Sequence, residues 1–467
     1  MVFSSIVFMF FYLPIVLGVY YLVPQKWRSP WLFIVNFVFY GWAEPVFIIL
    51  MLFSMAVNYI SGWIISDCKE SNPKKAKIII VICVVINLAM LVLYKYADLF
   101  ISSANVVAGH DIIPLLKLTL PLGISFYTFQ TMSYTIDVYR GDGEVQKDFI
   151  KFGTFVALFP QLVAGPIVRY KDIDDQLVYR EHSVAKFASG VQRFTIGLAK
   201  KVLIANNVGT LWDKYAAMGA GELTLAGSWL GMIAFSLQIY FDFSGYSDMA
   251  IGLGRMMGFE FLENFEHPYI SRSITEFWRR WHMSLGTWFR DYVYIPLGGN
   301  RKGSARQYLN IMIVWALTGF WHGANWTFLI WGIYYGILLI IEKRFLLKVL
   351  KKAPGMLSNL YVLVMTIIGW VLFQLNSLEH SGMYYKALFG FGEAGAYASY
   401  DIYYLTSFLV IILIGVLAST PIPKKLYGKL PEKLRSIATP VLIVLALALC
   451  TAYLVDATYN PFLYFRF

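Results

Sequence analysis

The sequence predicts an all-α, polytopic membrane protein. Of its 467 residues, 58% are hydrophobic and only 14% are charged, and the mean hydropathy is +0.60. A soluble protein of this length would carry more charge and less apolar surface. The apolar residues also gather in runs of membrane-helix length, separated by short basic segments.

Apolar runs along the chain mark the candidate helices. In order they are residues 2–23, 31–43, 45–65, 78–94, 97–108, 113–136, 149–166, 188–212, 223–243, 308–322, 326–342, 357–375, 403–419 and 437–455. Several are shorter than the ~20 residues that a bilayer demands. We therefore expect some of them to be half-helices or re-entrant segments packed inside the protein.

Basic residues between the runs predict the orientation. Lys and Arg concentrate at 69–77, 343–352 and 424–435, and the positive-inside rule places all three segments in the cytoplasm. The single crossing at 437–455 then puts the C-terminus outside. Because the net charge of +11 is explained by such segments, we expect no nucleic-acid partner.

The stretch 264–328 is the candidate catalytic region, because it is basic, interrupted by glycines and holds three of the six histidines. His322 ends the run 308–322, whose twelve or so helical residues climb only about 18 Å and predict a site near mid-membrane. An imidazole there could take a proton from an attacking hydroxyl and return it to a leaving thiol. Asn325 follows as a polar partner. The alternative is a structural histidine satisfied by one neighbour.

Residues 273–288 have the periodicity of an interfacial amphipathic helix, with Glu276 and Arg280 spaced to pair. His282 lies at the border of its two faces, and the alternative is that it only forms a hydrogen bond at headgroup level. The following segment is a cationic, glycine-rich loop that would suit a phosphate-bearing donor. Its candidate donor-binding residues are Arg290, Arg301, Lys302 and Arg306. The alternative is a solvated positive-inside loop.

Other motifs have little support. The three cysteines are far apart, and neither an H-E-x-x-H nor a G-x-S-x-G motif occurs, so we expect no metal and no serine hydrolase. The run from Gly252 to Gly258 lacks the spacing of a dinucleotide fingerprint. Two acidic residues in an apolar run, Asp242 and Asp248, are assigned to structure, with Arg279 or Arg290 as expected partners.

Three runs resemble the membrane-bound O-acyltransferase (MBOAT) family: QIYFDFSGYSDMAIGLG, ENFEHPYISRSITEFWRRWHMSLGTWFRDYVYIPLGGNRKG and TGFWHGANWTFLIWG. The similarity extends from MVFSS to PFLYFRF, and is strongest to the bacterial branch that exports acetyl groups to alginate, cellulose or peptidoglycan. The resemblance implies one membrane domain over 1–467, with about 10–12 spanning helices plus re-entrant and interfacial helices around a central tunnel. It implies a multi-pass protein of the bacterial cytoplasmic membrane, in contact with lipid.

The resemblance also implies the chemistry. His322 would be the central catalytic residue, with His282 as a second histidine on the approach. The donor would be a cytoplasmic acyl thioester, most simply acetyl-CoA, with no bound cofactor. The tail 456–467 resembles a motif linked to acyl relay, with Tyr464 as first acceptor. An SGNH-type acetyltransferase outside would then modify a surface polysaccharide or peptidoglycan.

From the residues and this resemblance we expect His322 to act as general base, and Asn325 or nearby backbone N–H groups to steady the oxyanion. Two alternatives stay open. One is a proton-coupled transporter or flippase, which the absence of a detectable internal repeat disfavours. The other is a long-chain acyltransferase that acts on lipid or protein.

Overall fold

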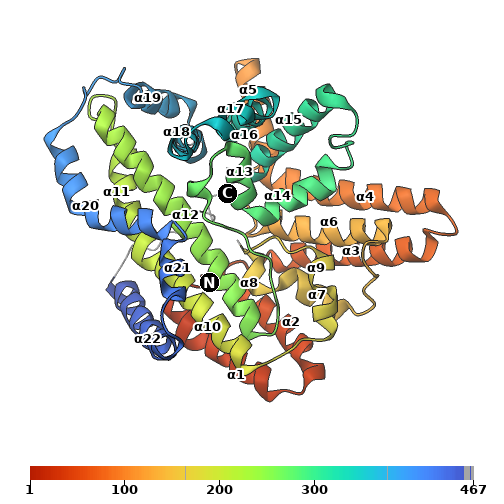
Figure 1. The fold of residues 1–467 in the computed structure, drawn as a ribbon. Coiled ribbons are helices and arrows are strands. Elements are labelled where there is room, and N and C mark those ends of the chain that lie inside the picture. The colour runs from red at the N-terminus through yellow and green to blue at the C-terminus, as the bar shows by residue number, and fades with distance from the viewer. Residues whose placement is uncertain (164, 376, 457–462, 464–467) are drawn as a thin grey trace. The chain divides into compact units, whose positions relative to one another are not determined.

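The computed structural model describes residues 1–163, 165–375, 377–456 and 463 (Figure 1). Helices and irregular segments make up this described part, which contains no strand, so the all-α prediction is confirmed. Five helical segments are long and apolar enough to cross a membrane: α3 (Ile48–Cys68), Pro73–Ala108, α18 (Gly355–Gln374), α20 (Ser399–Ala418) and α22 (Glu432–Asp456). The other described helices are shorter or more polar, and the expected total of about 10–12 stays a prediction.

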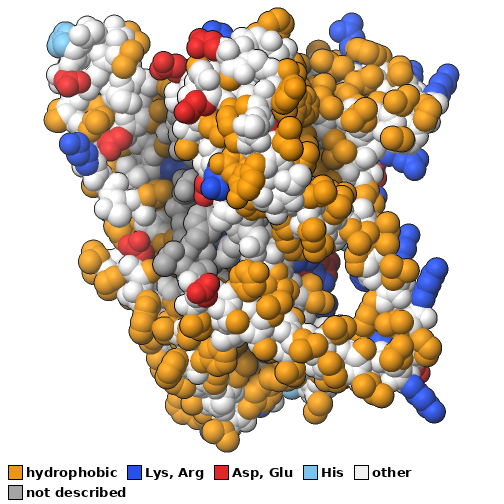
Figure 2. Space-filling model, turned by 90° about the vertical axis from the view of Figure 1, so that its left-hand side faces the viewer, with side chains coloured by type: hydrophobic (Ala, Val, Ile, Leu, Met, Phe, Trp, Pro, Cys, Tyr) orange, Lys and Arg blue, Asp and Glu red, His pale blue; other side chains and the backbone are white. Residues whose placement is uncertain are grey.

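The surface is largely apolar. Figure 2 shows hydrophobic side chains over much of one face, with many Lys and Arg side chains projecting at its edge. Large side chains are widely exposed, among them Leu22 at 84% and Val107 at 89%. Such exposure of apolar surface is expected of a protein whose solvent is lipid.

The helices group into two compact units, which are described separately. Unit 1 comprises Met1–Phe194 and Tyr246–Leu262, and unit 2 comprises Thr195–Gly245 and Glu263–Phe467. Two helices, α10 (Val184–Ala199) and α12 (Leu225–Met256), contribute residues to both units. The single membrane domain over 1–467 stays a prediction.

Unit 1 is built from short and long helices around buried rings. After the π-helical turn Phe8–Tyr12 it contains α1 (Leu13–Leu22), α2 (Gln25–Gly41), α3, α4 (Pro73–Leu91), α5 (Ala97–Ala108), α6 (Ile124–Arg140), α7 (Phe149–Ala157), α8 (Phe159–Leu162) and α9 (Tyr170–Val178). Helices α3, α4 and α6 lie side by side (Figure 1). Asn58 of α3 bonds Asn87 of α4 at 3.0 Å and accepts from Thr135 of α6 at 2.8 Å. Hydrogen bonds between buried polar side chains therefore link these helices.

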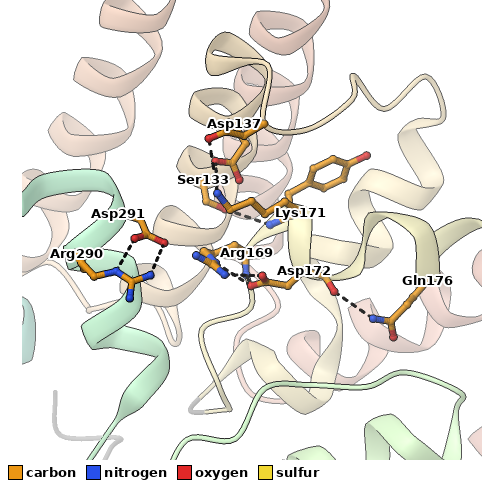
Figure 3. A network of polar contacts seen from close by, with 10 residues as sticks. Ser133, Asp137, Arg169, Lys171, Asp172, Gln176, Arg290 and Asp291 are labelled. Carbon is orange, nitrogen blue, oxygen red and sulfur yellow. Dashed lines mark hydrogen bonds and ion pairs between the residues drawn. The ribbon is translucent and has the colours of Figure 1, made fainter. Parts of the chain in front are cut away.

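A second polar group of unit 1 fixes the start of α9. The Asp172 carboxylate accepts from the Arg169 backbone N–H at 3.0 Å and from its guanidinium at 2.7 Å (Figure 3). The Lys171 ammonium reaches the fully buried Asp137 at 3.7 Å. These pairs satisfy the charges at the start of α9.

Unit 2 holds the candidate catalytic region. After the π-helical turn Lys200–Ala205 it contains α11 (Asn206–Ala216), α13 (Ile274–Arg280), α14 (Met283–Phe289), α15 (Gly303–His322), α16 (Trp326–Ile341), α17 (Leu347–Lys352), α18, α19 (Leu378–Leu388), α20, α21 (Ile422–Gly428) and α22. Its core is strongly aromatic. Trp331 and Trp370 stack with centroids 6.4 Å apart, and Trp278 meets Tyr335 edge to face at 4.8 Å.

Side-chain caps explain where several helices begin. Asn72 caps α4 ahead of Pro73, Asp148 caps α7, and Ser273 caps α13. Each side-chain oxygen accepts a backbone N–H of the first turn that has no partner within the helix. These residue types at these positions were visible in the sequence.

Three expected boundaries were wrong. The run 113–136 becomes helical only at Ile124, after Gly123 adopts a left-handed φ of 71°. The run 223–243 continues as α12 to Met256. The basic segment 343–352, expected as a loop, is helical throughout, because α16 passes through a π-helical turn (Glu342–Leu346) into α17.

The glycine run at 252–258 has a packing role in unit 1. A Cβ atom at Gly252 would lie 2.6 Å from the Gly190 carbonyl oxygen of α10, so the two backbones approach closely there. Only glycine fits such an approach. Close helix packing therefore explains the glycine at 252, in a run that lacks the spacing of a dinucleotide-binding motif.

Candidate active site

His322 is the last residue of α15, and its imidazole is packed among aromatic rings of unit 2. It is 3% exposed. Edge-to-face contacts join its ring to Trp321, Trp331 and Phe373, with centroids 4.9, 5.1 and 5.0 Å apart. Trp331 and Phe373 come from α16 and α18, so three helices surround the imidazole.

The helical hairpin behind His322 depends on two glycines. A Cβ atom at Gly319 of α15 would collide with the Phe328 carbonyl oxygen of α16, and one at Gly332 would collide with the Trp315 carbonyl oxygen. The backbones of α15 and α16 therefore pack in near contact. This close packing positions His322 directly before the turn that begins α16.

The length argument for the depth of His322 was wrong. The helix that ends at His322 begins at Gly303 and has 20 residues, not twelve or so. At 1.5 Å per residue it extends about 30 Å, comparable to the hydrocarbon thickness of a bilayer. The mid-membrane position of His322 stays a prediction that helix length does not support.

His282 lies at a break that the periodicity did not predict. Residues 273–288 form two short helices, α13 and α14, because His282 between them has a left-handed φ of 45°. The expected pair of Glu276 and Arg280 is present at 2.8 Å. The side chain of His282 is buried, with 2% of its surface exposed.

Asn264 holds the His282 ring. The Asn264 Oδ1 atom accepts from the Ser284 backbone N–H at 3.2 Å and lies 3.1 Å from His282 Nδ1. Because an oxygen that takes a backbone N–H is an acceptor, Nδ1 of His282 must carry its proton. The Nε2 atom is then the basic nitrogen of the neutral ring. Burial lowers the pKa of His282 to about 3. The helices on either side of His282, α13 and α14, are not among the five candidate membrane spans.

Trp321 connects the two histidines. Its indole contacts the His322 ring and also the His282 ring, the latter with centroids 5.8 Å apart. Phe243 of α12 also packs edge to face against the His282 ring, with centroids 4.7 Å apart. Unit 2 therefore brings His282 and His322 to one aromatic site.

The side-chain oxygen of Asn325 has a structural role at the start of α16. Its Oδ1 atom accepts from the Thr327 backbone N–H at 3.0 Å and caps α16. The amide NH₂ is the group that an oxyanion would need. The predicted oxyanion role of Asn325 is not tested by this contact.

The cationic loop has the expected glycine geometry. Gly298, Gly299 and Gly303 have left-handed φ values of 102°, 54° and 84°, which non-glycine residues rarely adopt. Arg290 pairs with the adjacent Asp291 at 2.8 Å and its side chain is 62% exposed (Figure 3). Arg301, Lys302 and Arg306 are also exposed. The loop thus presents cations, and its role as a donor site stays a prediction.

Comparison with known proteins decides the family. A model of the membrane-bound O-acyltransferase family matches residues 144–384, just over half of the chain. The chain belongs to this family. It is therefore an MBOAT enzyme, and the matched region includes both histidines, Asn325 and the cationic loop.

Relatives of this MBOAT enzyme match most of its length. A probable alginate O-acetylase AlgI of Pseudomonas putida is 40% identical over 100% of both chains. Another, of Pseudomonas aeruginosa, is 45% identical over 84% of this chain and 75% of the relative. The peptidoglycan O-acetyltransferase of Helicobacter pylori is 31% identical over 84% of this chain and 80% of the relative. The resemblance stated from the motifs is confirmed.

The expected partners of the two α12 carboxylates in the MBOAT enzyme were wrong. In unit 2, Asp242 pairs with Lys201 at 2.6 Å. In unit 1, Asp248 pairs with Arg193 at 2.6 Å. In the described part of the chain, the ion-pair partners of these carboxylates are not Arg279 or Arg290. Both carboxylates are ion-paired, as the cost of an unpaired charge requires, but with cations from α10 and the following π-helical turn.

Sequence reasoning missed three residues of the site. Asn264 was not singled out because only its contact with His282, 18 residues away, reveals its role. Trp331 and Phe373 belong to ordinary apolar runs, and nothing in their spacing distinguishes them from other core residues. Tyr464, the predicted acyl relay, lies outside the described residues.

Proposed function

We propose that this MBOAT enzyme takes an acetyl group from cytoplasmic acetyl-CoA and passes it across the bacterial cytoplasmic membrane. The final acceptor would be a surface polysaccharide or peptidoglycan. One observation carries the proposal: two buried histidines contact the same Trp321 ring within the region that the family model matches. The full-length similarity to a probable alginate O-acetylase supports acetyl as the group transferred.

The proposed reaction is a direct acyl transfer. A hydroxyl oxygen attacks the thioester carbonyl carbon, and His322 takes the hydroxyl proton. The new C–O bond forms, the C–S bond breaks, and the same proton goes to the departing thiolate. No covalent histidine intermediate is required, because a thioester is already activated.

Neighbouring groups would assist in distinct ways. The Asn325 amide or backbone N–H groups at the start of α16 would stabilise the oxyanion. His282 would accept a hydrogen bond through Nε2, because Asn264 fixes its proton on Nδ1. The phosphates of the donor would bind the exposed cations Arg301, Lys302 and Arg306, the last of which lies in the first turn of α15.

Acceptance of the acetyl group would involve the tail 456–467. Tyr464 would be the first acceptor, and an SGNH-type acetyltransferase outside the membrane would complete transfer to the polymer. This part of the proposal is supported by the resemblance of the tail, and by the positive-inside rule, which predicts that the C-terminus is outside.

Because His322 is buried, the substrates of the proposed reaction need a route to its imidazole. Its imidazole is 3% exposed and is surrounded by three rings. A donor and an acceptor reach it only along a narrow passage or after a ring such as Phe373 rotates. This requirement favours a short acyl group over the long-chain alternative. Membership in an acyltransferase family favours acyl transfer over the transporter alternative.

The test is the variant His322→Ala, with His110→Ala as matched control because His110 is exposed in unit 1. Loss of general-base catalysis should lower acetylation of the polymer at least about 100-fold. The measurement is mass analysis of polysaccharide and peptidoglycan from cells that express each variant at equal membrane abundance. Wild-type acetylation by His322→Ala would refute the role of His322.

A further inference from the structure

A buried ion pair of unit 2 lies outside the chemistry proposed above. The Lys201 Nζ atom is 2.6 Å from Asp242 Oδ1, and the two side chains are 2% and 3% exposed. Lys201 belongs to the π-helical turn Lys200–Ala205 and also donates to Asn206 at 3.2 Å. Asp242 lies in the middle of α12.

The second oxygen of Asp242 binds the tail. Asp242 Oδ2 accepts from the backbone N–H of Leu463 at 2.9 Å, across 221 residues of sequence. Leu463 is 4% exposed and belongs to the aromatic core of unit 2. The preceding helix, α22, packs against the π-helical turn that carries Lys201. One carboxylate therefore joins the tail to α12.

Charge makes this contact strong. A hydrogen bond from a backbone N–H to an ionised carboxylate is shorter and stronger than one to a neutral acceptor. The Lys201 ammonium lies beside this carboxylate as its ion-pair partner, since a buried charge without a partner is very costly. An ion pair between Lys201 and Asp242 alone would join only the π-helical turn and α12. Here the two oxygens of Asp242 have separate partners, the Lys201 ammonium and the Leu463 backbone N–H.

We propose that Asp242 is the anchor that docks Leu463 in unit 2, and that Lys201 supports it. Asp242 is thus a positioning residue. Docking does not depend on the proposed function. The consequence of docking for acyl transfer does rest on the proposed function. Leu463 immediately precedes Tyr464 in the sequence, so an anchor at Leu463 would also position Tyr464.

The experiment measures burial of position 463 in full-length protein in native membranes. Leu463→Cys keeps the backbone N–H and introduces a thiol, while Cys68, Cys83 and Cys450 are buried. The rate of maleimide labelling is compared with and without Asp242→Ala, Asp242→Asn or Lys201→Met. Asp248→Asn is the matched control, because Asp248 is the other ion-paired carboxylate of α12.

We expect Leu463→Cys to label slowly alone and with Asp248→Asn. Adding Asp242→Ala should raise the rate about tenfold or more, since a hydrogen bond to a charged group is lost. Asp242→Asn keeps an acceptor oxygen, so its rate should lie between these values. Slow labelling with Asp242→Ala, in protein that remains in the membrane, would overturn the anchor.

Acetylation separates the anchor from the relay. If Tyr464 is the acceptor, Asp242→Ala should lower polymer acetylation together with Tyr464→Phe, while thioester binding is retained. If labelling rises and acetylation does not fall, the anchor stands and the relay role of Tyr464 is excluded. If Asp242→Ala does not accumulate, Asp242→Asn and Lys201→Met still decide the labelling result.

Discussion

At the residue scale, His282 combines three features that are individually rare. Its backbone is left-handed, its ring is buried, and its proton is fixed by Asn264. Of the non-glycine residues, asparagine tolerates this backbone region best, whereas alanine would add strain. Asparagine is therefore the variant that removes the imidazole with least effect on the fold.

His282 should make the stability of the protein depend on pH. The pKa of an unfolded histidine is about 6.5, whereas burial lowers the pKa of folded His282 to about 3. As pH falls below about 6.5, the unfolded state gains a proton that the folded state does not, so stability is lost. Above this pH the contribution is constant.

Thermal unfolding of detergent-purified protein at pH 7 and pH 5 tests this. Wild type should lose more stability between these values than His282→Asn. The exposed His110→Asn should behave like wild type. Equal losses in wild type and His282→Asn would contradict a neutral, buried His282.

The residue types of the site were predictable, but their contacts were not. His322 stood out because the helix ends beside it and the polar Asn325 follows, and His282 because arginine and tryptophan residues precede it in a strongly apolar chain. Their partners Asn264 and Phe373 could not be inferred, because those contacts depend on how separate helices pack. The predicted partners of Asp242 and Asp248 were wrong for the same reason.

At the scale of the element, α13 is held by a carboxylate from another helix. Glu342 is fully buried and accepts from the Ile274 and Thr275 backbone N–H groups at 2.6 and 2.8 Å, and from the Thr275 hydroxyl at 2.6 Å. Its charge also complements the N-terminus of α13. Because α13 leads directly to His282, Glu342 fixes one wall of the site.

Glu342→Gln should destabilise the protein, because a neutral amide accepts these bonds less strongly. Loss of charge at such bonds costs roughly 1.5–3 kcal/mol, so the unfolding temperature of a chain of this length should fall by about 1.5–3 °C. Glu379→Gln is the control, since Glu379 is an exposed acid in the first turn of α19. An unchanged unfolding temperature for Glu342→Gln would show that Glu342 does not hold α13.

The cationic loop gives a kinetic prediction. Replacing Arg301, Lys302 and Arg306 together by alanine should raise the KM for acetyl-CoA about tenfold and leave kcat nearly unchanged, because the proposed function assigns these exposed cations to donor binding and not to the reaction. The increase should shrink at high salt. Lys351→Ala with Lys352→Ala, exposed cations of α17, is the control. An unchanged KM would leave the loop as a solvated segment.

Elements were predicted well where a long apolar run decides them and poorly where a single backbone angle does. The runs that became α3, α18, α20 and α22 were found within a few residues. Residues 273–288 had a correct amphipathic period, yet the left-handed φ of His282 divides them. Periodicity reports which face is apolar, and it does not report one dihedral angle.

At the scale of the whole molecule, the sequence makes a topological prediction that helix packing does not decide. The basic segments at 69–77, 343–352 and 424–435 lie next to spanning candidates, and the positive-inside rule assigns each to the cytoplasm. The segment between α18 and α20 is then outside. Under the proposed function, this arrangement would let acetyl-CoA enter from one side and the acceptor from the other.

Cysteine labelling in intact cells tests this orientation. Ser71→Cys, in the exposed turn between α3 and α4, should resist a membrane-impermeant maleimide until the cells are opened. Ala396→Cys, exposed before α20, should label in intact cells, because it lies on the opposite side of a spanning helix. The buried native cysteines keep the background low. Labelling of Ser71→Cys in intact cells would reverse the topology, and with it the side from which the donor must enter.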